Sequence, residues 1–205
     1  MNEARTEILA RVREALAGSA IDVPEPPTPR DLAPVVTPEV IDLFAERVAD
    51  YRAVVERCGL DQVEERVAAA LPPGQAVVPP GLSIRVADAV VDDGTLTAAE
   101  LDRIAAVVTE ARVGIAETGT IVLDHAPNQG RRAISLVPDT HVCIVREDQV
   151  VPDVPDAVAL LDPARPLTWI SGPSATSDIE LDRVEGVHGP RTLHVLVVAP
   201  REVTS

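Results

Sequence analysis

The sequence contains two polar loops whose side chains could bind or act on a ligand. In the first, Glu117, Thr118, Gly119 and Thr120 stand between two apolar segments. Ligands of open α/β sheets bind outside the carboxyl ends of strands, so Glu117 could serve there as a base, a nucleophile or a hydrogen-bond acceptor. The alternative is a hairpin turn in which Gly119 supplies a positive φ angle and Thr118 closes the turn.

The second loop follows the apolar residues that end at Ile170. It precedes a predicted helix after Ser177, and the free N–H groups of a helix start can hold a carboxylate or a phosphate. The residues of this loop that we expect to bind such a ligand are Ser171, Gly172, Ser174, Thr176, Asp178 and Glu180. The alternative is that Ser174, Ser177 and Asp178 only cap the helix.

Three further residues could complete the site. Arg131 and Arg132 follow Gly130 and could clamp a carboxylate together; the alternative is a solvated pair that balances the acidic surface. His188 titrates near neutral pH but has no Ser or Cys partner at the spacing of a catalytic triad. Because the chain has no lysine and few histidines, we expect Glu117 to be held near the sheet and paired with an arginine such as Arg131.

The charge and the cysteine content exclude several functions. Basic residues number 18, all of them arginine, against 33 acidic residues, for a net charge of −15. So acidic a chain would repel nucleic acid and anionic membranes, and without lysine it has neither a Schiff-base nor a P-loop lysine. Because Cys58 and Cys143 are its only cysteines, the chain cannot hold an iron-sulfur cluster alone, and we expect it to bind no metal or cofactor.

The amino-terminal residues stand apart from the expected core. Residues 2–17 place aliphatic side chains at helical spacing, which predicts a docking helix. The segment from Gly18 to Pro38 contains six prolines, Pro38 included, which exclude a regular helix or a central strand. We therefore expect a helix and a proline-rich arm over residues 1–38 and a single α/β domain over residues 39–205. No signal peptide or apolar run of roughly 18 residues is present, so we expect a cytoplasmic protein without a membrane span.

The elements that must position the loops follow from apolar periodicity and breaker residues. Helices are predicted from Pro38 to Gly59 and over residues 61–71, 97–109 and 153–161. Strands are predicted over residues 76–78, 84–86, 89–91, 113–116, 120–123, 133–137, 142–145, 167–170 and 193–198. Several strands are continuous apolar runs, which indicates cover on both faces. The predicted fold class is α/β, a three-layer, mostly parallel open sheet.

Taken together, the polar motifs resemble the lactate utilization protein C family, which contains the LUD domain. The motifs that carry the resemblance are Glu117-Thr118-Gly119-Thr120, Gly130-Arg131-Arg132, the string S-G-P-S-x-T-x-D-I-E from Ser171 to Glu180, and Gly186-Val187-His188-Gly189-Pro190. The resemblance covers residues 110–200. It implies a fold similar to the sugar-phosphate isomerase and CoA-transferase-like group.

The resemblance also implies a function, and a second hypothesis stands beside it. Members of the family accompany iron-sulfur partner proteins in the oxidation of L-lactate to pyruvate, which implies an accessory, non-redox component here. The alternative is a stand-alone CoA-transferase-like or ligase-like enzyme that acts on a small carboxylate or phosphate, with Glu117 as the candidate nucleophile.

Overall fold

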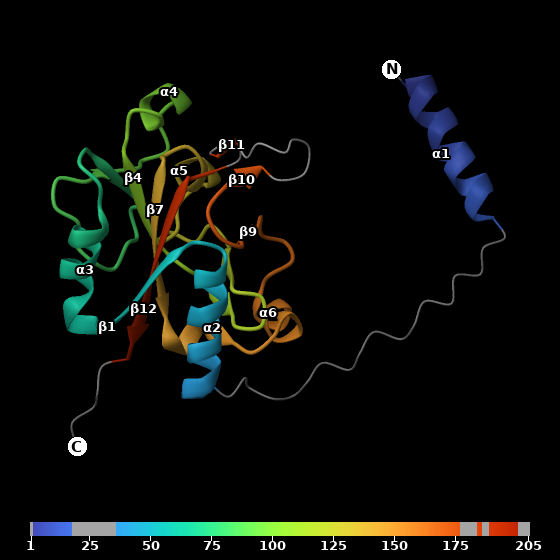
Figure 1. Cartoon of the computed structure of the whole chain (residues 1–205). Helices are drawn as coiled ribbons and strands as arrows, with labels where there is room; N and C mark the ends of the chain where they lie inside the picture. The colour runs from blue at the N-terminus through green and yellow to red at the C-terminus, as the bar shows by residue number, and fades with distance from the viewer. Residues whose placement is uncertain (1, 18–35, 177–183, 186–188, 201–205) are drawn as a thin grey trace. The chain divides into compact units, whose positions relative to one another are not determined.

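The computed structural model describes residues 2–17, 36–176, 184–185 and 189–200 (Figure 1). The chain divides into two compact units, Met1–Asp31 and Leu32–Ser205, and each is described by itself. In the first unit, helix α1 spans Asn2–Leu16 and exposes Ile8, Val12 and Leu16. The predicted amino-terminal helix is therefore confirmed, and its docking function stays a prediction.

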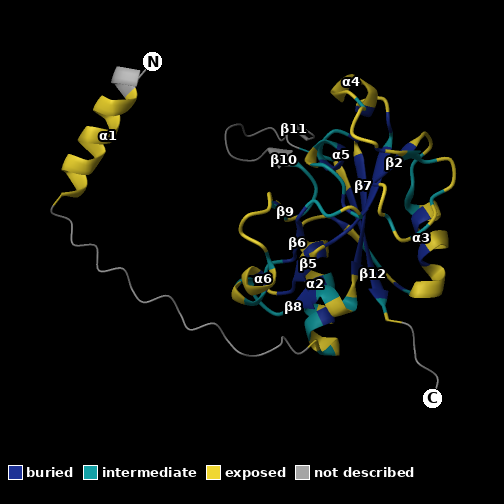
Figure 2. Ribbon diagram, turned by 180° about the vertical axis from the view of Figure 1, so that it is seen from behind, coloured by how far each residue is buried: buried dark blue, intermediate teal, exposed yellow. Residues whose placement is uncertain are grey.

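The second unit is built on a sheet of six parallel strands in the order β1-β12-β7-β4-β2-β3. The strands are β1 (Val54–Gly59), β2 (Ala76–Val78), β3 (Val90–Val91), β4 (Ala106–Glu110), β7 (Thr140–Arg146) and β12 (Thr192–Ala199). The central strands are buried along almost their whole length (Figure 2). These strands carry apolar side chains on both faces, so both faces of the sheet are covered by other parts of the chain.

A second, smaller sheet has the order β8-β5-β6-β9. Its strands are β5 (Val113–Ile115), β6 (Thr120–Leu123), β8 (Val150–Val151) and β9 (Thr168–Ile170). Strand β6 is antiparallel to β5 and β9, whereas β8 is parallel to β5. The strand pair β10 (Ala175–Thr176) and β11 (Val184–Glu185) is also antiparallel. The sequence analysis predicted most of these strands but not their separation into a sheet of their own.

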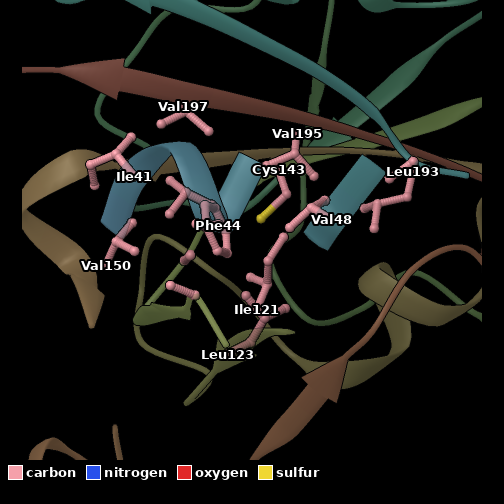
Figure 3. Close-up of a cluster of buried hydrophobic side chains, with 14 residues drawn as sticks. Ile41, Phe44, Val48, Ile121, Leu123, Cys143, Val150, Leu193, Val195 and Val197 are labelled. Atoms are coloured by element: carbon pink, nitrogen blue, oxygen red, sulfur yellow. The ribbon is translucent and has the colours of Figure 1, made fainter. Parts of the chain in front are cut away.

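Helices cover both faces of the main sheet. The helices are α2 (Pro38–Asp50), α3 (Val63–Ala70), α4 (Ala98–Leu101), α5 (Arg132–Leu136) and α6 (Val154–Leu160), with 3-10 turns at Leu60–Gln62 and Glu147–Gln149. Alternate residues of β7 serve opposite layers: Cys143 and Val145 pack with Phe44 of α2 (Figure 3), whereas Val142 and Ile144 pack with α3. The predicted three-layer, mostly parallel α/β class is confirmed.

Two segments adopt a structure other than the predicted one. Residues 133–137, predicted as a strand, lie in α5 and its carboxyl end, because a short apolar run fits a strand and a buried helical turn equally well. Residues 97–109, predicted as one helix, form α4 and then β4. A capping box between Thr97 and Glu100 starts α4, and the β-branched Val107 and Val108 favour a buried strand.

Two further predictions are wrong near the edges of the main sheet. Helix α2 ends at Asp50, because Arg52 takes a left-handed φ of 66°, and the residues from Val54 onward form β1. Strand β1 is partly exposed and has no regular alternation, so its valines fitted the helical spacing of α2. Residues 84–86, predicted as a strand, belong to a loop that packs on the core beside α3.

Candidate functional site

The loop at residues 117–120 is the turn of the β5–β6 hairpin, as the alternative interpretation of the sequence predicted. Gly119 has a φ of +60°, and its Cα lies close to the backbone of α2 at Arg47. The side chain of Glu117 is exposed, and no described residue forms an ion pair with it. The expected pairing of Glu117 with Arg131 is not found, because Arg131 binds Asp92 instead.

Gly119→Ala is expected to lower the free energy of unfolding by about 2 kcal/mol, since it combines left-handed strain with a steric clash. An added Cβ would lie 2.5 Å from the carbonyl carbon of Arg47. Gly94→Ala is the matched control, because Gly94 has a φ of +90° but no heavy atom of the described chain within 4 Å of an added Cβ. Urea unfolding followed by circular dichroism measures both variants. Equal losses would show that the close approach to α2 contributes nothing.

Hydroxyl groups connect the two loops that the sequence analysis singled out. The Thr118 hydroxyl donates to Thr120 Oγ1 at 2.8 Å, and Thr120 Oγ1 lies 2.8 Å from Ser171 Oγ. The pairing of Ile121 with Ile170 in strands β6 and β9 fixes this contact, because it places the preceding and following residues side by side. This contact joins the two loops, and the ligand site that they were expected to share stays a prediction.

A pocket of about 240 Å³ lies beside Ser171, between the main sheet, α5 and the segment that follows β9. It is lined by Arg132, Ser135, Leu136, His141, Thr168, Trp169, Ile170, Ser171, Gly172, Pro173, Ser174, Gly189, Pro190 and Leu193. His141 and Leu193 stand near the amino ends of β7 and β12. The pocket therefore lies at the amino ends of these main-sheet strands. The sequence analysis expected a site at the carboxyl ends of strands.

The two adjacent arginines have different surroundings. The Arg131 guanidinium binds the Asp92 carboxylate through two hydrogen bonds, of 2.8 Å and 3.0 Å, and donates to the Leu96 carbonyl at 2.6 Å. These bonds raise the pKa of Arg131. Arg132 is exposed at the pocket, and no carboxylate in the described part of the chain pairs with it. The proposed joint clamp is thus contradicted, because Arg131 is already bound to Asp92.

Two histidines that were not among the predicted site residues lie at or near the pocket: His141 lines it, and His125 contacts the lining residue Thr168. His125, with a left-handed φ of 56°, places Nε2 2.9 Å from Thr168 Oγ1 and Nδ1 2.9 Å from the Gly130 carbonyl. His141 is 1% exposed, and its Nε2 lies 2.8 Å from Thr109 Oγ1. Burial lowers the pKa of His141 to about 4, so the ring is neutral at neutral pH. The available sequence signal for His141 was its position as a polar residue directly before the apolar residues 142–145.

Comparison with known proteins places the chain in a family. A family model described as the LUD domain matches residues 37–198. The chain belongs to the LUD domain family. A lactate utilization protein C of Deinococcus radiodurans is 45% identical over 207 residues, which cover 96% of each chain. A lactate utilization protein C of Bacillus licheniformis is 34% identical over 122 residues, 56% of this chain and 50% of that one.

A solved structure has the same fold as this LUD domain. The crystal structure of a DUF162 family protein from Deinococcus radiodurans has a TM-score of 0.67 and 41% sequence identity, and the match covers 78% of this chain and 96% of that chain. The family resemblance predicted from the polar motifs is therefore confirmed. The individual site residues stay predictions.

Several predicted residues of the LUD domain cannot be placed at the pocket. Asp178, Glu180 and His188 lie outside the described residues, and Thr176 belongs to β10. In the ranges that the structure describes, no three His, Cys, Asp or Glu side chains gather as metal ligands. No helix in those ranges combines the length and the apolar character needed to cross a membrane.

Proposed function

We propose that this LUD domain is an accessory, non-redox component of a lactate utilization system. In this proposal it works in the cytoplasm beside iron-sulfur partner proteins that oxidise L-lactate to pyruvate. It binds a small carboxylate in the pocket lined by Arg132 and Ser171, the Arg132 pocket. The supporting comparison is the 45% identity, over 96% of both chains, to a protein named lactate utilization protein C. A relationship over almost the full length supports a shared system more strongly than a match to one domain would.

The observation that carries the ligand assignment is the charge of the pocket. Arg132 is the one charged side chain among the described lining residues, and the chain as a whole has a net charge of −15. An arginine that pairs with no carboxylate in the described ranges favours an anion, and its planar donors match a carboxylate. Hydroxyl groups of Ser171 and Thr168 and the apolar Leu136 and Leu193 suit a small organic acid.

Arg132→Gln is expected to weaken the binding of L-lactate by about tenfold to a hundredfold, because it removes a charge-assisted hydrogen bond. Chemical-shift changes of the full chain in a lactate titration give the dissociation constant. The control is Arg85→Gln, which makes the same charge change at an exposed position of the loop that packs beside α3. Equal affinities of both variants and the wild type would remove Arg132 from the site.

The partner proposal has a separate test in the native host. Affinity purification of the full chain is expected to recover cysteine-rich partners, and deletion is expected to impair growth on lactate. Normal growth on lactate with no such partner recovered would end the proposal. The stand-alone transferase gains no support from the structure, because its candidate nucleophile, Glu117, is exposed on a hairpin turn and is absent from the pocket lining.

A further inference from the structure

A second pocket, of about 380 Å³, lies at the carboxyl ends of β4 and β7. Its lining includes Ala111, which follows β4 directly, and Gln149, in the 3-10 turn after β7, together with residues of the loops after β6 and α6. Among the described residues, none lines both this pocket and the Arg132 pocket. Open α/β sheets bind ligands at the carboxyl edge, so the polar groups here indicate what the pocket could hold.

The wall of the second pocket contains a buried amide with an unused donor. Gln129 is 2% exposed, and its Oε1 accepts hydrogen bonds from the backbone N–H groups of Asp124, at 2.6 Å, and His125, at 3.1 Å. Two N–H donors can face only the carbonyl oxygen, which fixes the orientation of the amide and leaves Nε2 without a hydrogen bond in the described chain. Nε2 is not sealed in the core, because His194 Nε2 is the one fully buried side-chain N or O atom of the described residues that lacks a partner. The amide is therefore open to the pocket that Gln129 lines.

Two arginines of the same lining are held in place and keep unused donors. Arg165 Nε donates to the Asp124 carbonyl at 3.0 Å, and Arg112 Nη2 donates to the Leu160 carbonyl at 3.0 Å. Both guanidiniums lie near one carboxylate oxygen: Asp124 Oδ2 is 3.6 Å from Arg165 Nε and 4.0 Å from Arg112 Nε, beyond hydrogen-bond length. Neither Nη group of Arg165, nor Nη1 of Arg112, makes a hydrogen bond within the ranges that the structure describes.

We propose that this second pocket binds a small monocarboxylate. The unused donors of Gln129, Arg112 and Arg165 need acceptor atoms, and a carboxylate supplies two oxygens that accept hydrogen bonds and donate none. Ala126 and Leu160 add apolar surface to the lining, which suits a short aliphatic chain. The inference goes beyond the proposed function and does not rest on it, because it concerns a different pocket.

The charges of the lining favour a ligand with a single negative charge. Arg112 and Arg165 contribute two positive charges. Asp124 and Asp162 contribute two negative charges, so the lining is formally neutral. A phosphate group with close to two negative charges would be repelled by both aspartates, whereas a monocarboxylate adds one charge and receives the donors of three side chains.

An NMR titration of the full chain with sodium acetate tests the site. The side-chain amide signals of Gln129 are expected to shift and to saturate, because Nε2 donates to the bound carboxylate. Inorganic phosphate is the second probe, at mildly alkaline pH, where most of it is a dianion. It is expected to bind about tenfold more weakly than acetate because of its second charge.

Two variants test the donors. Arg165→Gln changes a side chain that is 40% exposed and is expected to weaken acetate binding by about tenfold. Arg132→Gln makes the same change at the other pocket, so it is the matched control and should leave the acetate response of Gln129 unchanged. Gln129→Glu keeps an acceptor for the two backbone N–H groups but replaces the free donor with an anionic oxygen. It should abolish acetate binding, followed through the side-chain amide of Asn128.

The possible outcomes separate the claims. A Gln129 signal that does not saturate, or equal acetate affinity in Arg165→Gln and the wild type, overturns the proposed site. Phosphate binding as tight as acetate binding overturns the choice of a monocarboxylate, and undiminished binding by Gln129→Glu overturns the function of the amide. If Gln129→Glu does not fold, Arg165→Gln still decides the question. Failure of lactate to bind at the Arg132 pocket would contradict the proposed function and leave this result unchanged.

Discussion

Arg131→Gln is expected to lower the free energy of unfolding by about 3 kcal/mol, whereas Arg132→Gln changes it by less than about 0.5 kcal/mol. Asp92 is 4% exposed, and Arg131 is the cation that binds its carboxylate. Removing this partner leaves a buried negative charge with weaker hydrogen bonds. The estimate is at the low end for a buried pair, because the Arg131 side chain is 35% exposed and water screens part of the interaction.

Urea unfolding of the two single variants measures this difference, and a double variant tests its cause. Asp92→Asn in the Arg131→Gln background removes the buried charge and should recover part of the lost stability. The neighbouring substitution at Arg132 is a close control, since it changes the same residue type at the next position. Equal losses from the two arginine variants would contradict the distinct surroundings that the structure gives them.

The sequence predicted those parts of the fold that depend on local patterns. Strands β7 and β12 contain the apolar runs 142–145 and 195–198, and α2 begins at Pro38 after the cap residue Thr37, as its capping pattern indicates. Strand β1 was missed because its partners lie far along the chain: Val54 pairs with His194. Only that pairing makes these residues a strand.

The candidate site was likewise predicted where it depends on local motifs and missed where it depends on contacts between residues far apart in the sequence. Two hydroxyl-rich loops were expected to share a site, and the contact between Thr120 and Ser171 joins them. The two arginines are adjacent in sequence, but Asp92, which determines the role of Arg131, is 39 residues away. His141 went unnoticed because its partner, Thr109, is 32 residues away on another strand. The spacing of these residues along the sequence therefore predicts neither contact.

Phe44→Ala is expected to lower the free energy of unfolding by about 3–5 kcal/mol, because it removes a large, fully buried side chain from the core between α2 and the main sheet (Figure 3). The chain has three aromatic residues, Phe44, Tyr51 and Trp169, and Tyr51 and Trp169 are exposed. The small aliphatic residues around Phe44 cannot fill the space that its ring leaves. Leu43→Ala, at a partly buried position beside the same core, is the comparison and should cost less.

The ring of Phe44 is also the reason that position 114 is glycine. An added Cβ at Gly114 would lie 2.9 Å from Cζ of Phe44 and 3.3 Å from a methyl group of Val145. Gly114→Ala alone should therefore cost about 1–3 kcal/mol, as overpacking does in a tight core. In the Phe44→Leu background the ring is absent, so the same substitution should cost about 1 kcal/mol less than it does in the wild type. Urea unfolding of the wild type, both single variants and the double variant gives this coupling energy. Strictly additive losses would show that the Phe44 ring does not limit the side chain at position 114.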